Sequence, residues 1–160
     1  MRRDLIALHP ESKVWVYASN KLIPDAQIAA IKQDIVDFTM QWQSHGQNLD
    51  CYGNIFHERF LVLVADDTHH VSGCSIDSSV HFVKALEAKY NLNFFDRMTY
   101  HYVVDEVFHT IHHSQLKAAY NEGTINDDTL MVDNLVNTKE TFLERWIVPL
   151  NMSWYKKLLS

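Results

Sequence analysis

The sequence contains few residues that break regular structure and few that crosslink it. Only four glycines and three prolines occur among its 160 residues, which argues against a loop-rich or repeat architecture. The two cysteines, Cys51 and Cys74, are too few for a disulfide framework or a four-cysteine zinc site. No internal repeat and no low-complexity tract is present. The composition thus argues against the classes of protein that depend on a disulfide framework, on repeats or on a four-cysteine zinc site.

Long apolar runs and a concentrated basic surface are also missing. No stretch approaches the roughly 18 apolar residues of a membrane span, and no apolar run of signal length follows the basic residues Arg2 and Arg3. The net charge is −6 with neutral histidines, and the 14 lysines and arginines are scattered. A nucleic-acid backbone requires a concentrated basic face. We therefore expect a cytoplasmic protein whose partners are neither nucleic acid nor membrane.

The apolar content is high enough for a full core. Hydrophobic residues make up 47% of the chain, and a domain of this length buries roughly two thirds of the surface that its unfolded chain exposes. We expect one globular domain over residues 1–160. Its core is predicted at about 13–104, and a C-terminal helical extension at about 105–160.

Strand and helix patterns alternate through the predicted core. Phe60 to Ala65 is apolar at every position, which predicts a central strand covered on both faces. Gly53 and Asn54 are predicted to interrupt the preceding strand as a turn or bulge. The predicted elements are a strand at 14–18, a helix at 24–42, strands at 49–52 and 59–65, a helix at 76–90 and a strand at 98–104. This β-α-β-β-α-β order predicts the α+β class, as a ferredoxin-like split βαβ sandwich.

The last third of the chain has a less regular pattern. It predicts a helix near 106–121, a short strand at 130–132, and a helix capped by Thr138 that ends before Pro149. The tail that follows carries Trp154 and Tyr155, close to Trp146. We expect this tail to dock onto the domain or onto a partner, and a homodimer is one form of such docking.

The stretch Ser72-Gly73-Cys74-Ser75-Ile76-Asp77-Ser78 joins the most apolar strand to the second helix. A helix presents unpaired N–H groups and a partial positive charge at its first turn. The first interpretation is capping alone, in which the Ser75 hydroxyl accepts a hydrogen bond from the Ser78 amide. In the second, Ser75, Asp77 and Ser78 line a site for an anionic small molecule. Asp77 weakens that hypothesis by its charge, and Arg59 or Arg97 would restore it by offering paired donors.

A third interpretation of the same turn makes Cys74 a nucleophile. A helix N-terminus can lower the pKa of a thiol, and a histidine can accept its proton. His45, in a loop with Gly46 after the first helix, is the first candidate for that base. Asp77 opposes formation of the thiolate unless its side chain is turned away.

Ten histidines are the one unusual feature of the composition. His109, His112 and His113 would share one face of the helix predicted at 106–121, so that two of them could bind a metal ion. The zinc-protease pattern H-E-x-x-H is absent, and a solvated helix face is the preferred interpretation. We therefore assign no metal site, and the sequence identifies no cofactor.

Several short motifs occur together along nearly the whole chain. They are Ser44-His45-Gly46, Arg59-Phe60-Leu61, Ser72 to Ser79, Phe95-Asp96-Arg97-Met98, Thr138-Lys139 and Ser153-Trp154. Together they resemble a family of small uncharacterised bacterial proteins often labelled "ABC transporter ATPase", and the stretch from Ser72 to Ser79 is the most specific part. The resemblance implies no activity and no site residues. The label conflicts with the sequence, since no G-x-x-x-x-G-K-[ST] motif is present to hold nucleotide phosphates.

Three functional hypotheses follow from the sequence. The first is a domain that binds an anionic small molecule at the helix start between Gly73 and Ser79. The second is a cysteine-dependent enzyme that uses Cys74 with His45. The third is an interaction module that docks through its C-terminal tail. The sequence alone does not rank the first two.

Overall fold

The computed structural model describes residues 1–66 and 73–160, apart from the side chain of Cys74. At the centre of its first sheet lies β5 (Phe60–Ala65), in which all six residues are buried. It pairs antiparallel with β1 (Lys13–Ala18) on one side and with β4 (Cys51–Phe56) on the other. The prediction of a central strand is therefore confirmed.

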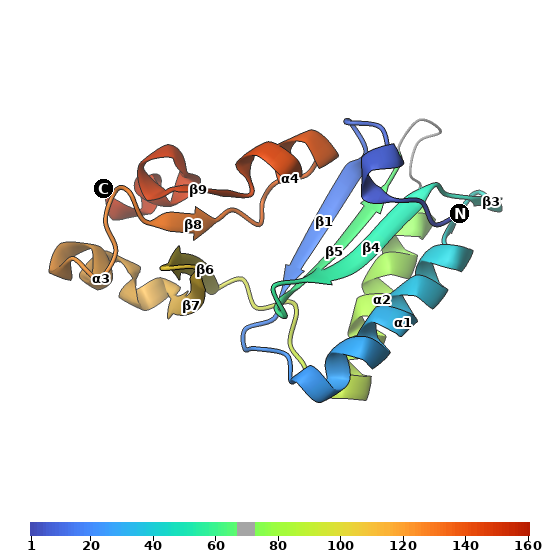
Figure 1. The fold of residues 1–160 in the computed structure, drawn as a ribbon, viewed down its shortest axis with the longest axis horizontal. Helices are drawn as coiled ribbons and strands as arrows, with labels where there is room; N and C mark the ends of the chain where they lie inside the picture. The colour runs from blue at the N-terminus through green and yellow to red at the C-terminus, as the bar shows by residue number, and fades with distance from the viewer. Residues whose placement is uncertain (67–72) are drawn as a thin grey trace.

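Alternate residues of β5 belong to two different hydrophobic clusters. Leu61, Leu63 and Ala65 face the helices α1 (Asp25–Gln41) and α2 (Gly73–Tyr90), which cover one face of the sheet (Figure 1). Phe60, Val62 and Val64 pack on the opposite face against residues from the C-terminal half of the chain. Successive side chains of a strand point to opposite faces, so a strand covered on both faces must be apolar throughout.

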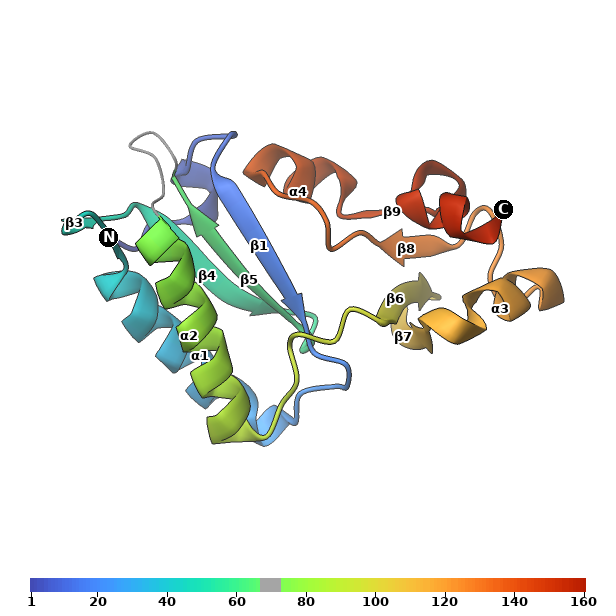
Figure 2. The ribbon, with the colours of Figure 1, turned by 180° about the vertical axis from the view of Figure 1, so that it is seen from behind.

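The opposite face of the sheet is covered by the N-terminal segment and by several segments of the C-terminal half. Leu5, from the short 3₁₀ turn η1 (Leu5–Ala7), packs there together with Leu8. Phe142, in α4 (Lys139–Arg145), and Trp146, which follows that helix, supply the aromatic part. Figure 2 shows the sheet from behind, with α1 and α2 together on one side and α4 beyond β1.

The sixth predicted element forms, but it joins another sheet. β6 (Thr99–Val104) lies in a four-stranded sheet of order β7-β6-β8-β9. β6 pairs antiparallel with β7 (Val107–His112) on one side and with β8 (Leu130–Val132) on the other. β8 in turn pairs antiparallel with β9 (Ile147–Pro149). The chain thus has the predicted α+β composition. The first sheet has only three strands, so the fourth strand of a ferredoxin-like sandwich is not beside β1.

The prediction of a helix at 106–121 is wrong for the first half of that range. Residues 107–112 form β7, and α3 (Leu116–Glu122) begins only after the 3₁₀ turn η2 (His113–Gln115). Asp105 and Glu106 both have positive φ, 51° and 64°, as in the two-residue turns that join tight hairpins. The hydrogen bonds to β6 and this turn outweigh a helical spacing of apolar residues. The region at 105–160 is therefore a mixture of strands and helices, not a helical extension.

The C-terminal tail packs within the chain. It contains the 3₁₀ turns η3 (Leu150–Met152) and η4 (Trp154–Leu159). Leu150 and Tyr155 are buried in a third cluster, and the Tyr155 hydroxyl donates to the carbonyl oxygen of Val132 at 2.7 Å. Thr138 caps α4 as predicted, in a reciprocal arrangement with Thr141. No helix in the described residues combines the length and the apolarity needed to cross a lipid bilayer.

Gly53 pairs in continuous register with Leu63, so the predicted bulge is absent. A Cβ atom at this position would lie 2.7 Å from Ile35 Cγ2 and 2.9 Å from Leu63 Cδ2. The missing side chain therefore lets α1 approach the sheet closely.

We expect Gly53→Ala to lower the free energy of unfolding by roughly 1–3 kcal/mol, because the added methyl overpacks this contact. Urea denaturation measures the change. Met40→Ala, at a position of α1 that is 57% exposed, is the control and should have little effect. An unchanged or raised stability of Gly53→Ala would contradict the close approach.

Candidate functional site

The first turn of α2 lies against the hairpin formed by β2 (Gln43–Ser44) and β3 (Gln47–Asn48). The helix begins at Gly73, earlier than predicted, so Ser75 lies inside its first turn and is not the N-cap. Ser75 is buried, and its hydroxyl donates to the carbonyl oxygen of Gln43 at 2.6 Å. The indole N–H of Trp42 donates to the carbonyl oxygen of Ser75 at 2.9 Å. The capping interpretation is thus wrong for Ser75, which connects α2 to the end of α1.

The other residues of the predicted site are dispersed. Asp77 and Ser78 are exposed on α2, and His45 is exposed in the turn of the hairpin with φ of 51°. The side chain of Cys74 lies outside the described residues, so the pairing of Cys74 with His45 stays a prediction. The structure places Gln43, two residues before His45, against the first turn of α2.

Arg59, the first of the two predicted counter-charges, lies at the other end of the sheet. Arg59 precedes β5, so the whole strand, about 17 Å at 3.4 Å per residue, separates it from the start of α2. Its guanidinium donates to the carbonyl oxygen of Phe108 at 3.5 Å, and burial lowers its pKa. Arg97 follows the far end of α2 and is exposed. Arg59 is therefore not beside Ser75 and Ser78.

The three clustered histidines do not share a helical face. His109 and His112 lie on β7, where positions three apart point to opposite faces. His113 follows the strand, and its Nδ1 is 2.8 Å from the hydroxyl of Tyr100. The described residues contain no group of three or more side chains placed to hold a metal ion.

A groove of about 620 Å³ runs along the outer edge of β1. We call it the edge groove. Ile76 and Val80 of α2 contribute one wall. The remaining lining comes from residues 94–97, 99–100 and 134–137, and from the aromatic pair Trp154 and Tyr155. The rings of Trp154 and Tyr155 stack with their centroids 4.1 Å apart.

The main chain of β1 alternates between two directions. Ser19 N–H donates to the carbonyl oxygen of Arg59, which is opposite it when the register of β1 with β5 is continued by one residue. Since hydrogen-bonded pairs alternate along an antiparallel ladder, the odd-numbered residues of β1 point their main-chain groups toward β5. Even-numbered residues point outward, as Val14 N–H does to the carbonyl of Asn137 at 3.0 Å. Within the described chain, the outward main-chain groups of Val16 and Ala18 have no hydrogen-bond partner. An unpaired stretch of strand therefore faces the edge groove.

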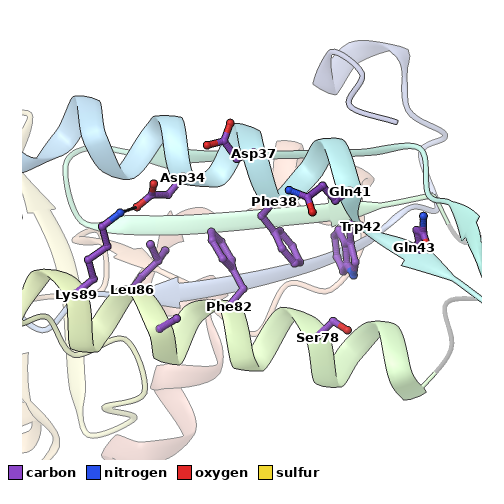
Figure 3. Close-up of a pocket in the computed structure, with 11 residues that line it drawn as sticks. Asp34, Asp37, Phe38, Gln41, Trp42, Gln43, Ser78, Phe82, Leu86 and Lys89 are labelled. Atoms are coloured by element: carbon purple, nitrogen blue, oxygen red, sulfur yellow. Dashed lines mark hydrogen bonds and ion pairs between the residues drawn. The ribbon is translucent and has the colours of Figure 1, made fainter.

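A second groove, of about 610 Å³, lies between α1 and α2 on the outside of the helical layer (Figure 3). We call it the interhelical groove. Phe38 and Phe82 stack in it with ring centroids 4.3 Å apart and planes 3° from parallel. Asp34 accepts hydrogen bonds from Lys89 at 2.8 Å and from the Tyr90 hydroxyl at 2.6 Å. Burial alone would raise the pKa of Asp34, but these two hydrogen bonds lower it below its ordinary value.

Sequence reasoning missed both grooves for different reasons. Phe38 was assigned to the buried face of its helix, and Asp34 and Lys89 are ordinary helix-surface residues in the sequence. The edge groove depends on where β6 goes, which the local sequence pattern does not encode. Two residues link the predictions to these cavities, since Ser78 lines the interhelical groove and Arg97 lines the edge groove.

His101 is buried where the first sheet meets the second. Its Nε2 lies 3.2 Å from the carbonyl oxygen of Ser19, and its ring contacts Phe60 with centroids 4.9 Å apart. No partner for its Nδ1 is found in the described residues. Burial, reinforced by the positive charge of Arg59, lowers the pKa of His101 to about 4, while Ser19 and Asp96 oppose the shift.

We expect stability to fall as the pH decreases from 6.5 to about 4. In this window the unfolded chain binds a proton at His101 and the folded chain does not, so protonation favours unfolding. With pKa values of 6.5 and about 4, the loss is roughly 3 kcal/mol. Denaturant unfolding across this range measures it. His101→Gln should flatten the dependence and His81→Gln, at an exposed position, should not. Equal slopes in the two variants would contradict the assignment.

Comparison with known proteins does not suggest a function for this chain. No family model matches the chain, no curated protein matches it, and no solved structure matches it. The two grooves and the groups that line them are therefore the basis for a functional proposal.

Proposed function

We propose that this protein is an interaction module that binds an extended peptide segment of a partner protein. The segment lies in the edge groove and adds a strand to β1. The observation that carries the proposal is the outward main chain of Val16 and Ala18, unpaired within the described chain, inside a groove with mostly apolar walls. Unpaired strand edges bind extended peptides through main-chain hydrogen bonds, and neighbouring pockets select the side chains.

The main chain defines the length of the segment. Val14 N–H is bound by the Asn137 carbonyl at one end, and Asn20 N–H is bound by the Asn93 carbonyl at the other. Between these points the edge spans about 20 Å, at 3.3 Å per residue. A cavity of about 620 Å³ lies within the roughly 300–1,000 Å³ range of ligand pockets. These dimensions favour one short segment over the edge of a second complete sheet.

The walls favour apolar side chains on the segment. Ile76 belongs to the apolar pattern that predicted the inward face of α2, but it is 38% exposed. Leu135, on the opposite side of the groove, is 68% exposed. Side chains alternate along an added strand, so one set would cover Ile76 and Val80 and the other would cover Leu135. Burial of this surface adds to the main-chain hydrogen bonds.

The three hypotheses drawn from sequence fare differently against this geometry. The anion hypothesis relies on the hydroxyls at the start of α2, but that of Ser75 is bound to Gln43. It also relies on two arginines, of which Arg59 lies at the other end of the sheet. The tail hypothesis relies on accessible residues in the C-terminal tail, but Leu150 and Tyr155 of this tail are buried within the chain. The interaction class therefore gains support at the edge of β1, where Trp154 and Tyr155 of the tail contribute to the lining of the groove.

The test uses random peptides displayed on phage and selected on the full chain. We expect enriched sequences with apolar residues at alternate positions. A synthetic copy of an enriched peptide should slow hydrogen exchange at the Val16 and Ala18 amides. Binding is measured by titration calorimetry.

Two variants separate edge pairing from other modes of binding. Val16→Pro removes an outward N–H and leaves the ladder to β5 intact, so it should abolish binding of the selected peptide. Ile76→Glu should weaken it at least tenfold, whereas Val107→Glu, at a site on β7 that is 55% exposed, should leave the affinity unchanged. If folded Val16→Pro and Ile76→Glu bind like the parent chain, or if no peptide is enriched, the proposal is wrong.

A further inference from the structure

The interhelical groove has the features of a small-molecule site that is independent of β1. We propose that it binds a small organic cation that carries a flat apolar group. The proposal does not rest on peptide binding, because the groove lies on the outer surface of the helices, on the other side of α1 and α2 from the sheet. Figure 3 shows Phe38 and Phe82 pointing toward one another between the two helices.

The floor of the groove is aromatic. Phe38 and Phe82 are only partly buried, and their rings stack in nearly parallel planes. Trp42 lies next to Phe38, with ring centroids 5.1 Å apart, and is itself buried. A flat apolar group can therefore contact the exposed parts of the two phenylalanine rings, and aromatic faces also attract cations.

The charges around the groove select the sign of the ligand. Its lining contains two carboxylates, Asp34 and Asp37, and one ammonium group, that of Lys89. Lys89 pairs with Asp34 at 2.8 Å. Asp37 accepts a hydrogen bond from the neutral amide of Gln33 at 2.9 Å and has no ion pair in the described chain. One negative charge thus remains without a cationic partner at the edge of an aromatic surface.

The spacing on α1 places these groups together. Asp34 and Phe38 are four residues apart, and Asp37 and Gln41 are four residues apart, so each pair shares a face of the helix. An anionic ligand would meet two carboxylates, and a neutral ligand would leave Asp37 uncompensated. A cation completes the charge pairing, and its apolar part covers the phenylalanines. The site therefore differs in sign from the anion site predicted at the start of α2.

The test compares three probes of similar shape and different charge. They are 2-phenylethylamine, a cation at neutral pH, 2-phenylethanol, which is neutral, and phenylacetate, an anion. Backbone NMR spectra of the full chain are recorded during titration with each. We expect the amine to bind most tightly and to shift amide signals of residues 34–43 and 78–89. Phenylacetate should bind most weakly.

Variants on the rim act in opposite directions. Asp37→Asn should weaken amine binding by up to roughly fivefold, as for a solvent-exposed ion pair. Lys89→Ala should strengthen it, because Asp34 loses its own cation. Glu144→Gln, at an exposed position on α4, is the matched control and should change nothing.

The outcomes distinguish this site from the proposed function. Val16→Pro should leave amine binding unchanged, since β1 takes no part in it. Equal binding of the three probes would overturn the proposal, as would an amine affinity that Asp37→Asn does not lower. So would shifts confined to residues outside the two helices. Phe82→Leu, which keeps the groove apolar without its stacked pair, should weaken the amine and separates ring contact from simple burial.

Discussion

Burial of β5 on both faces is the constraint on which the rest of this structure depends. Its six apolar residues require two layers of covering structure, and the N-terminal half of the chain supplies only part of the second layer. The helices α1 and α2 cover Leu61 and Leu63, while Phe142 and Trp146 cover Phe60 and Val62. The C-terminal half must therefore return to the first sheet after it has built a sheet of its own. This return explains why the chain does not complete a four-stranded sandwich.

The route of the chain leaves a consequence at β1. After α2, the segment around Asn93 binds the end of the strand at Asn20, and β6 then turns away into the second sheet. The returning chain binds the main chain of this region again at Asn137, whose carbonyl accepts from Val14 N–H, and at Thr138, which forms a bridge with Lys13. The edge between these contacts is flanked by apolar walls, and charge or proline, the usual protection of an exposed strand edge, is missing from Val14 to Ala18. A binding role accounts for this pattern better than a purely structural one.

The candidate sites show how far local reasoning extends. The juxtaposition of the second helix start with the loop after the first helix was inferred from sequence, and Ser75 does contact Gln43. The role of Ser75 could not be inferred in the same way, because a hydroxyl near a helix start is equally compatible with capping and with a tertiary hydrogen bond. Arg59 and Arg97 appeared suitable as counter-charges because the sequence carries no distance information. The direction of β5 then placed Arg59 at the far end of the sheet.

The sequence by itself determined the α+β class, the central position of Phe60 to Ala65, helix α1, and the capping of α4 by Thr138, because each depends on periodicity or on contacts within a few residues. Only the tertiary structure decided that 107–112 is a strand, that Gly53 accommodates Ile35, and that β6 leaves the first sheet. These outcomes depend on hydrogen bonds and packing between residues far apart in the chain. Both grooves belong to this second group, since each lies between elements whose separation no local pattern records.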